Sequence, residues 1–324
     1  MMFIGANAIS VFEWLSQRSG ENVLTDAEQA VFWQKFGNFH HSLLHHVLSV
    51  TEARKLVNNI RSTLLSRTVA VMRDQGFIFD GFLAQTNAGK AILYHVIEMS
   101  TGQVCCGKVY AVSDSQDSLG REIQANVEVH KDGIHPSIVH YRSVLQFQHV
   151  SEPSKNLIAL IMPLYQLCLT AVIEALADTL MPWYMFDHLA KSLFSAGLRF
   201  QSIGMSHADI KPENVMLANG EFYVIDLGAV VLLRSSAAEH TPGYGLDASF
   251  SCIEPVFDLN CIAVTLVRCC DNTFQVRPGM TRAKLQEAID RWGEDKSQYK
   301  QEVEHCLRAS SCAEVLELCK DIIR

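Results

Sequence analysis

The pattern of hydrophobic and polar positions divides the chain into three regions. From Thr25 to Met72, apolar residues recur at three- and four-residue steps behind a capping-box pattern, which predicts a helical extension within residues 1–75. Residues 76–162 instead contain five short apolar runs separated by glycine and polar turns, which predict a five-stranded sheet with one inserted helix. Helical periodicity returns over residues 163–324. The predicted fold class is therefore α+β.

Composition and charge narrow the classes of partner. The chain has 324 residues, of which 48% are hydrophobic and 19% charged, and its formal net charge is -8. No long basic run is present, so we expect neither a nucleic acid nor an anionic membrane surface as a partner. The longest apolar run, Leu157–Leu164, is far too short to cross a bilayer. The composition is that of an ordinary globular protein.

The cysteines and histidines favour structural roles. Ten cysteines include no CxxC pair, so the usual zinc spacing is missing and reduced thiols are expected. The first residues also lack the pattern of a signal peptide, which together with reduced thiols indicates a cytoplasmic or nuclear protein. His41 and His45 would share a helix face, but no third ligand is evident, and we expect a helix surface there.

One polar stretch, from His207 to Gly228, carries the candidate chemistry. It reads HADIKPENVMLANGEFYVIDLG, with a turn at Asn219-Gly220 and an apolar run that ends in Asp226. Two carboxylates, a lysine and an amide are thereby gathered on a loop, a hairpin and a strand end. Such a set can hold Mg²⁺ through hard oxygen ligands, orient a hydroxyl and neutralise a phosphoryl group.

This stretch resembles the catalytic loop and metal-binding motif of eukaryotic-type protein kinases, and the resemblance covers about residues 76–324. It implies a bilobal fold. Residues 76–162 would form an N-lobe with an antiparallel five-stranded sheet and one helix, and residues 163–324 would form a mainly helical C-lobe. It also implies ATP and Mg²⁺ as cofactors. By resemblance, Asp209 would orient the acceptor hydroxyl and Lys211 would stabilise the transferring phosphate, while Asn214 and Asp226 would bind the metal.

Further motifs occur in the order expected for this family. Lys108 resembles the lysine that pairs with the ATP phosphates, and Glu122 resembles its partner on the inserted helix, with Glu128 as the alternative. Asp258 resembles the buried aspartate behind the catalytic loop. The remaining matches are the Thr241-Pro242-Gly243-Tyr244 segment on the acceptor side, and Gly89, Met162, Leu164 and Met216 as nucleotide-binding residues.

Several positions depart from the family pattern. The glycine-rich loop would fall on Ala84, Thr86 and Gly89, so only its last glycine remains, which would alter the contact of backbone amides with phosphate. Ala208 stands where an arginine usually precedes the catalytic aspartate. The APE triplet and its arginine partner near residues 309–311 are both missing. Asn126 occupies a position where an apolar residue usually packs against the Leu227 position.

These observations lead to one expectation and two alternatives. We expect a serine/threonine protein kinase that transfers the γ-phosphate of ATP to a protein hydroxyl. The degenerate glycine loop and Asn126 instead favour a pseudokinase scaffold, with the helical extension binding a protein partner. The third alternative is a kinase-fold enzyme that acts on a small molecule. The DLG triplet and the Phe250–Glu254 segment also resemble those of Bub-type mitotic checkpoint kinases.

Overall fold

A computed structural model describes residues 75–85, 91–112, 117–148, 156–176, 179–236, 240–247 and 251–320. The predicted helical extension, with His41 and His45 within it, and Gly89 lie outside these residues. The described residues form two units: one comprises 75–112 and 141–164, and the other comprises 117–140 and 165–320. Each unit is described by itself. The predicted boundary between residues 162 and 163 remains a prediction.

The first unit consists of five strands, β1 (Phe77–Gln85), β2 (Ala91–Glu98), β3 (Val104–Val112), β4 (Ser143–Gln148) and β5 (Asn156–Pro163). The helices of the second unit are α5 (Asp117–Val129), α6 (Leu169–Leu176), α7 (Trp183–Ser202), α8 (Val256–Cys270), α9 (Arg282–Asp290), α10 (Ser297–Arg308) and α11 (Cys312–Lys320). Its short strands are β6 (Leu167–Cys168), β7 (Met205–Ser206), β8 (Val215–Ala218), β9 (Glu221–Val224) and β10 (Val231–Leu232). Its 3₁₀ turns are η2 (Pro212–Asn214), η3 (Leu227–Ala229) and η4 (Glu294–Lys296).

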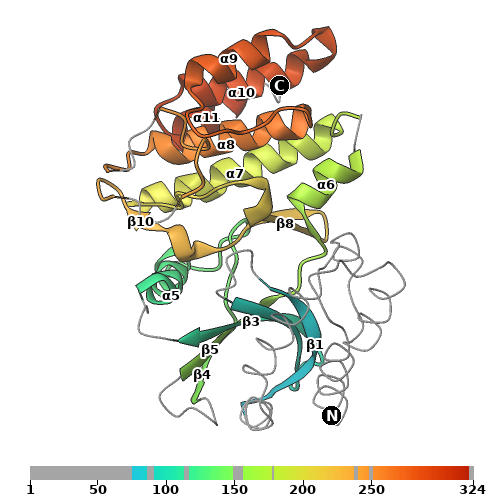
Figure 1. Cartoon of the computed structure of the whole chain (residues 1–324), viewed down its shortest axis with the longest axis vertical. Coiled ribbons are helices and arrows are strands. Elements are labelled where there is room, and N and C mark those ends of the chain that lie inside the picture. Colours follow the sequence, from blue (N-terminus) through green and yellow to red (C-terminus); the bar gives the residue numbers. More distant parts are fainter. Residues whose placement is uncertain are drawn as a thin grey trace, which may run out of the picture. The chain divides into compact units, whose positions relative to one another are not determined.

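The strands of the first unit form one antiparallel sheet in the order β1-β2-β3-β5-β4, which confirms the predicted five-stranded sheet (Figure 1). The central strand β3 pairs with β2 on one side and β5 on the other. Lys108 is therefore opposite Leu93 on β2 and Leu160 on β5. A lysine on a central strand is held by two neighbours, so its backbone position is well fixed.

The core of the second unit is built on α7 and α8, which lie next to each other (Figure 1). Helix α8 is buried on nearly all sides, as its almost continuous apolar sequence requires. Helix α10 packs on α8 and α11 packs on α7. At Gly197 on α7 the helices come very close, because a Cβ there would lie 2.6 Å from the sulfur of Cys312. None of the helices within the described ranges is long and apolar enough to cross a membrane.

Helix α5 and the loop after it attach to the segment that carries Asp226. Helix α5 packs against η3, which contains Leu227. The amides of Val139 and Val224 donate to the carbonyls of Val224 and Ser137, both at 2.9 Å. Asn126 is buried and its Nδ2 donates to the carbonyl of Val139 at 2.8 Å. A polar residue at this position thus ties α5 to its own loop, while the packing against η3 remains.

The β8–β9 hairpin contains the predicted turn at Asn219-Gly220. Both residues have positive φ, 53° and 84°, which suits the tight turn of a two-residue hairpin. The hairpin places the loop before β8 and the segment after β9 at the same end. The residues just before β8 and Asp226 are therefore brought together by local chain geometry.

Candidate active site

A single buried carboxylate anchors the loop that follows β7. Asp258, on the first turn of α8, is 1% exposed. Its Oδ1 accepts hydrogen bonds from Ser206 Oγ at 2.9 Å and from the Ala208 amide at 3.0 Å, and its Oδ2 accepts one from the His207 amide at 2.9 Å. Burial raises the pKa of Asp258, and these donors together with His207 act in the opposite direction. The loop is therefore held by α8.

Ala208 adopts a left-handed backbone conformation within this loop. Its φ is +62°, a region that costs an L-residue roughly 1–2 kcal/mol. The Ala208 amide donates to Asp258, and this hydrogen bond helps to stabilise the strained conformation. Backbone strain next to Asp209 is consistent with a functional loop, because such strain clusters at active sites.

His207 connects the loop to the strand end that carries Asp226. Its Nδ1 accepts the Asp209 amide at 3.3 Å, so its Nε2 is the protonated nitrogen and donates to the carbonyl of Ile225 at 3.1 Å. The Ile225 amide in turn donates to the carbonyl of Asn214 at 2.9 Å. The peptide groups on both sides of Ile225 are therefore bound to the loop. The ring of Phe200 packs edge-on against His207, with centroids 5.5 Å apart.

Asp209, Lys211, Asn214 and Thr241 form one hydrogen-bonded network. Lys211 Nζ donates to Asp209 Oδ2 at 2.7 Å and to Thr241 Oγ1 at 2.6 Å. The Thr241 hydroxyl donates to Asp209 Oδ1 at 2.6 Å. Asn214 Nδ2 donates to the carbonyl and Oδ2 of Asp209 at 2.9 and 3.0 Å. Both oxygens of the Asp209 carboxylate are thus fixed in direction, which a group that must accept a proton from a bound hydroxyl requires.

The donor set of Asn214 and Asp226 fits Mg²⁺. Asn214 uses its amide nitrogen twice on Asp209, so its oxygen Oδ1 is the atom that can face a cation. Asp226 is exposed and has a left-handed φ of +63°, and its backbone is fixed through Ile225. A carboxylate and an amide oxygen are the hard ligands that Mg²⁺ prefers, with water completing its coordination.

The comparison with known families agrees with this geometry. A model of the protein kinase domain matches residues 87–245, about half of the chain. The chain belongs to the protein kinase superfamily. The match includes the whole network around Asp209, whereas the anchor Asp258 lies beyond it. A search of the curated proteins found no match.

The kinase domain also contains a polar contact that the sequence did not indicate. Arg268, on α8, contacts Glu213 Oε1 at 3.2 Å and donates to the Tyr244 hydroxyl at 2.9 Å. Burial raises the pKa of Tyr244 to about 12, and the hydrogen bond from Arg268 opposes this rise. Arg268 thereby links the catalytic loop to the segment that carries Thr241. Only its position, ten residues after Asp258 on the same helix, could have suggested a role.

The segment after Tyr244 is anchored by an amide side chain on α8. Asn260 Nδ2 donates to the carbonyl of Gly245 at 2.9 Å, and its Oδ1 accepts from Arg282 at 2.8 and 3.1 Å. Asp247 accepts the Arg282 amide at 2.8 Å. The Asn260 side chain on α8 thus joins this segment to Arg282 on α9. The arginine that the family usually has near residues 309–311 is missing here, and Arg282 is the cation in this contact.

The remaining predicted residues of the kinase domain are placed as follows. Lys108 is buried on β3, with Nζ 5.3 Å from the Tyr110 ring. Glu122 is 1% exposed on α5, whereas Glu128 is half-buried and accepts from Gln124 at 2.9 Å. Which of these two glutamates pairs with Lys108 remains a prediction. Met162 is buried at the end of β5, Leu164 follows it half-buried, and Met216 is on β8, opposite Cys168 and Tyr223.

Proposed function

We propose that this protein kinase domain transfers the γ-phosphate of ATP to serine or threonine hydroxyls of a protein, with Mg²⁺ as cofactor. The observation that carries the proposal is the closed triangle of Asp209, Lys211 and Thr241, with all three hydrogen bonds between 2.6 and 2.7 Å. These residues come from two segments thirty positions apart. Lysine two residues after the catalytic aspartate, joined to a threonine, favours serine/threonine over tyrosine acceptors.

Each residue has a defined task in the proposed transfer. Asp209 orients the acceptor hydroxyl and takes its proton as the hydroxyl oxygen bonds to the γ-phosphorus, while the bond from that phosphorus to the β,γ-bridging oxygen breaks. Lys211 offsets the negative charge of the transferring group, and Thr241 keeps Asp209 and Lys211 in register. Mg²⁺ held by Asn214 and Asp226 would neutralise charge on the phosphates. Lys108, supported by Glu122, would position the ATP phosphates. The remaining nucleotide contacts would come from Gly89, Met162, Leu164 and Met216.

The alternative is a pseudokinase that binds partners without efficient transfer. It is favoured by Ala84 and Thr86, which replace two glycines of the phosphate-covering loop. Side chains at these positions hinder the close approach of backbone amides to phosphate. The groups of the Asp209 network are all present, so the two functions differ in how well nucleotide is held.

Phosphate transfer from radiolabelled ATP in the presence of Mg²⁺ tests the proposal. Purified full-length protein is assayed on generic serine/threonine substrates and on itself, beside Asp209→Asn. Asp187→Asn is the matched control, because Asp187 forms a surface ion pair with Lys191 on α7. We expect transfer by the wild type and by Asp187→Asn, and none by Asp209→Asn. Nucleotide binding without transfer would establish the pseudokinase, and transfer that persists in Asp209→Asn would remove the proposed base.

A further inference from the structure

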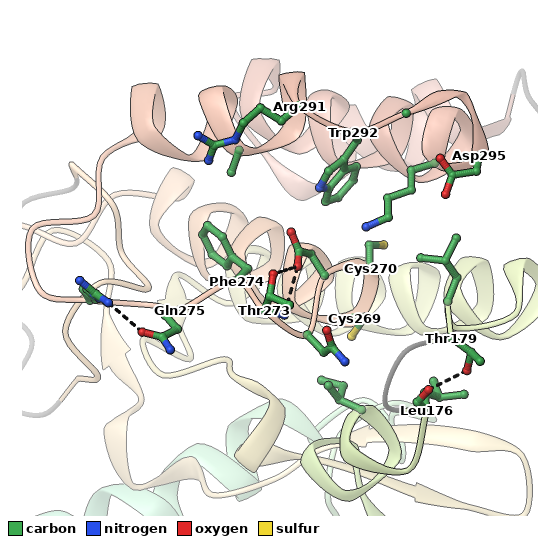
Figure 2. A pocket seen from close by; sticks show the side chains of 18 residues that line it. Leu176, Thr179, Cys269, Cys270, Thr273, Phe274, Gln275, Arg291, Trp292 and Asp295 are labelled. Atoms are coloured by element: carbon green, nitrogen blue, oxygen red, sulfur yellow. Dashed lines mark hydrogen bonds between the residues drawn. The ribbon is translucent and has the colours of Figure 1, made fainter.

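The second unit contains a cavity of about 760 Å³ that includes none of the catalytic residues. It lies between the end of α6, the end of α8 with the loop that follows, and the connection from α9 to α10 (Figure 2). Its volume falls in the range of ligand-binding pockets, and it is open to solvent. A cavity of this size on a helical unit is large enough for several side chains.

One wall of the cavity is apolar and the opposite wall carries hydrogen-bond donors. Ile173, Leu176 and Leu180 form the apolar wall, beside the buried thiols at the end of α8. Trp292 extends into the cavity from the connection between α9 and α10 (Figure 2). The indole nitrogen of Trp292 is buried, and no acceptor among the described residues lies within hydrogen-bond distance. A buried N–H group without an acceptor is costly, so this geometry suits a ligand that brings one.

The cavity lining holds three cationic side chains and two carboxylates. Lys296 Nζ lies 5.4 Å from the centroid of the Trp292 ring, and no carboxylate of the described residues lies within 4.0 Å of it. Arg277 and Arg291 add two further cations to the lining. The carboxylates are Asp271, which accepts from the amide and hydroxyl of Thr273 at 3.1 and 2.6 Å, and Asp295, which precedes Lys296 in η4. The cavity therefore presents cations and an N–H donor in a chain whose net charge is -8.

We propose that this cavity binds an acidic peptide segment of a partner protein. A glutamate or aspartate side chain of that segment accepts from Trp292 Nε1 and pairs with Lys296, while an apolar neighbour packs on Ile173, Leu176 and Leu180. An ammonium and a neutral N–H together match a carboxylate, which has two acceptor oxygens. Because the cavity is open to solvent, it suits a segment that passes through it, since small ligands are usually enclosed more fully. The inference does not depend on the kinase reaction.

Binding of defined peptides to the full-length protein tests this site. The probe is a fluorescein-labelled, amidated hexapeptide of alternating leucine and glutamate, and leucine–glutamine and leucine–lysine hexapeptides are its matched controls. Fluorescence polarisation gives the affinity. The indole ¹⁵N–¹H resonance of Trp292, assigned by its loss in Trp292→Phe, reports whether the peptide occupies this cavity.

We expect the glutamate peptide to bind more tightly than both controls and to shift the Trp292 resonance. Trp292→Phe keeps the ring but removes the donor, and Lys296→Gln removes the charge; each should weaken binding by about tenfold. Lys131→Gln, the same substitution at an exposed lysine outside the cavity, should leave it unchanged. Lys296→Gln tests the site even where Trp292→Phe impairs folding.

Three results would overturn the assignment. Equal affinity for the glutamate and glutamine peptides would show that charge plays no role. Affinity that is unchanged in both Trp292→Phe and Lys296→Gln would place the peptide elsewhere. A resonance shift with citrate but not with the peptide would make the cavity a site for small anions.

Discussion

Ala208 holds a left-handed backbone conformation, φ +62°, while its amide donates to the carboxylate of Asp258 at 3.0 Å. A strained residue beside the proposed catalytic base is thus tied to the most buried helix of its unit. Because α8 is the core of this unit, the geometry of the loop depends on the integrity of the core. The predictions below test this dependence and three other contacts.

Asp258→Asn should destabilise the domain more than the loss of one hydrogen bond. An asparagine keeps one acceptor but directs its Nδ2 at the amide of His207, which leaves two donors facing each other in a buried site. We expect the free energy of unfolding to fall by roughly 2–4 kcal/mol. Asparagine also avoids the cost of burying a charge, which lowers the expected loss of stability. The loss remains because three donors form hydrogen bonds with this carboxylate. Ser206→Ala, which removes one donor, should cost about 1 kcal/mol in urea unfolding.

Thr241→Val should impair transfer without unfolding the domain. Valine has nearly the same shape but neither donates to Asp209 nor accepts from Lys211. We expect kcat/KM for a protein acceptor to fall by roughly 10–100-fold, and Thr241→Ser to retain activity within about threefold. Steady-state kinetics with matched thermal melts provide the measurement. Equal activities of the valine and serine variants would show that the Thr241 hydroxyl does not position Asp209.

Acidification should destabilise the loop after α5 through His135. Burial is the main cause that lowers the pKa of His135 to about 4, and the neighbouring His130 and Arg199 lower it further. His135 Nδ1 accepts the Ser137 amide at 3.2 Å, an interaction that a protonated ring cannot make. The folded state therefore binds this proton less well than the unfolded state. Stability is fully present above about pH 6.5 and is lost as the pH falls from 6.5 towards 4.

The stability lost through protonation of His135 can be isolated with His135→Asn, because the amide oxygen of asparagine can accept the Ser137 hydrogen bond and does not titrate. His135 is only about half buried, so after allowance for solvent screening we expect wild type to lose roughly 1–2 kcal/mol more than the variant between pH 7.5 and 4.5. Urea unfolding at several pH values measures this difference. Parallel pH profiles for the two proteins would contradict the assignment to His135.

Gly197→Ala should destabilise the packing of α7, although alanine favours helices. The added Cβ would lie 2.6 Å from Cys312 Sγ and 3.5 Å from Ile262 Cδ1. We expect the free energy of unfolding to fall by about 1–3 kcal/mol. In a Cys312→Ala background the space is available and the penalty should largely disappear. Gly120→Ala on α5 is the control, because its Cβ meets nothing within 4 Å, and it should be neutral or stabilising by up to about 1 kcal/mol.

The residues that the sequence predicted best are those that the chain itself brings together. Asp209, Lys211 and Asn214 lie within six positions, so a short motif fixes their relative geometry. The five strands and the inserted helix were found because period and turns are local signals. The first residue of that helix, Asp117, was not predicted. Helix ends depend on capping and packing that periodicity does not contain.

Contacts between distant segments were not predictable in the same way. Arg268 joins Glu213 and Tyr244 only because α8 passes beneath two loops, and nothing in its neighbouring residues indicates this. Asn126 stands where an apolar residue usually packs against the Leu227 position, yet its amide donates to the carbonyl of Val139 and α5 still packs on η3. The cavity around Trp292 likewise arises from three segments that are remote in sequence.

The two hydrogen bonds of Ile225 determine where the segment that carries Asp226 can pivot. Its amide is bound to Asn214 and its carbonyl to His207, so the chain up to residue 225 moves with the catalytic loop as one body. Rotation of the Asp226 side chain away from the site must therefore begin at Asp226 itself, whose φ is already +63°. A form in which Asp226 leaves the site while both bonds of Ile225 stay intact therefore has its hinge at the first residue of the DLG triplet.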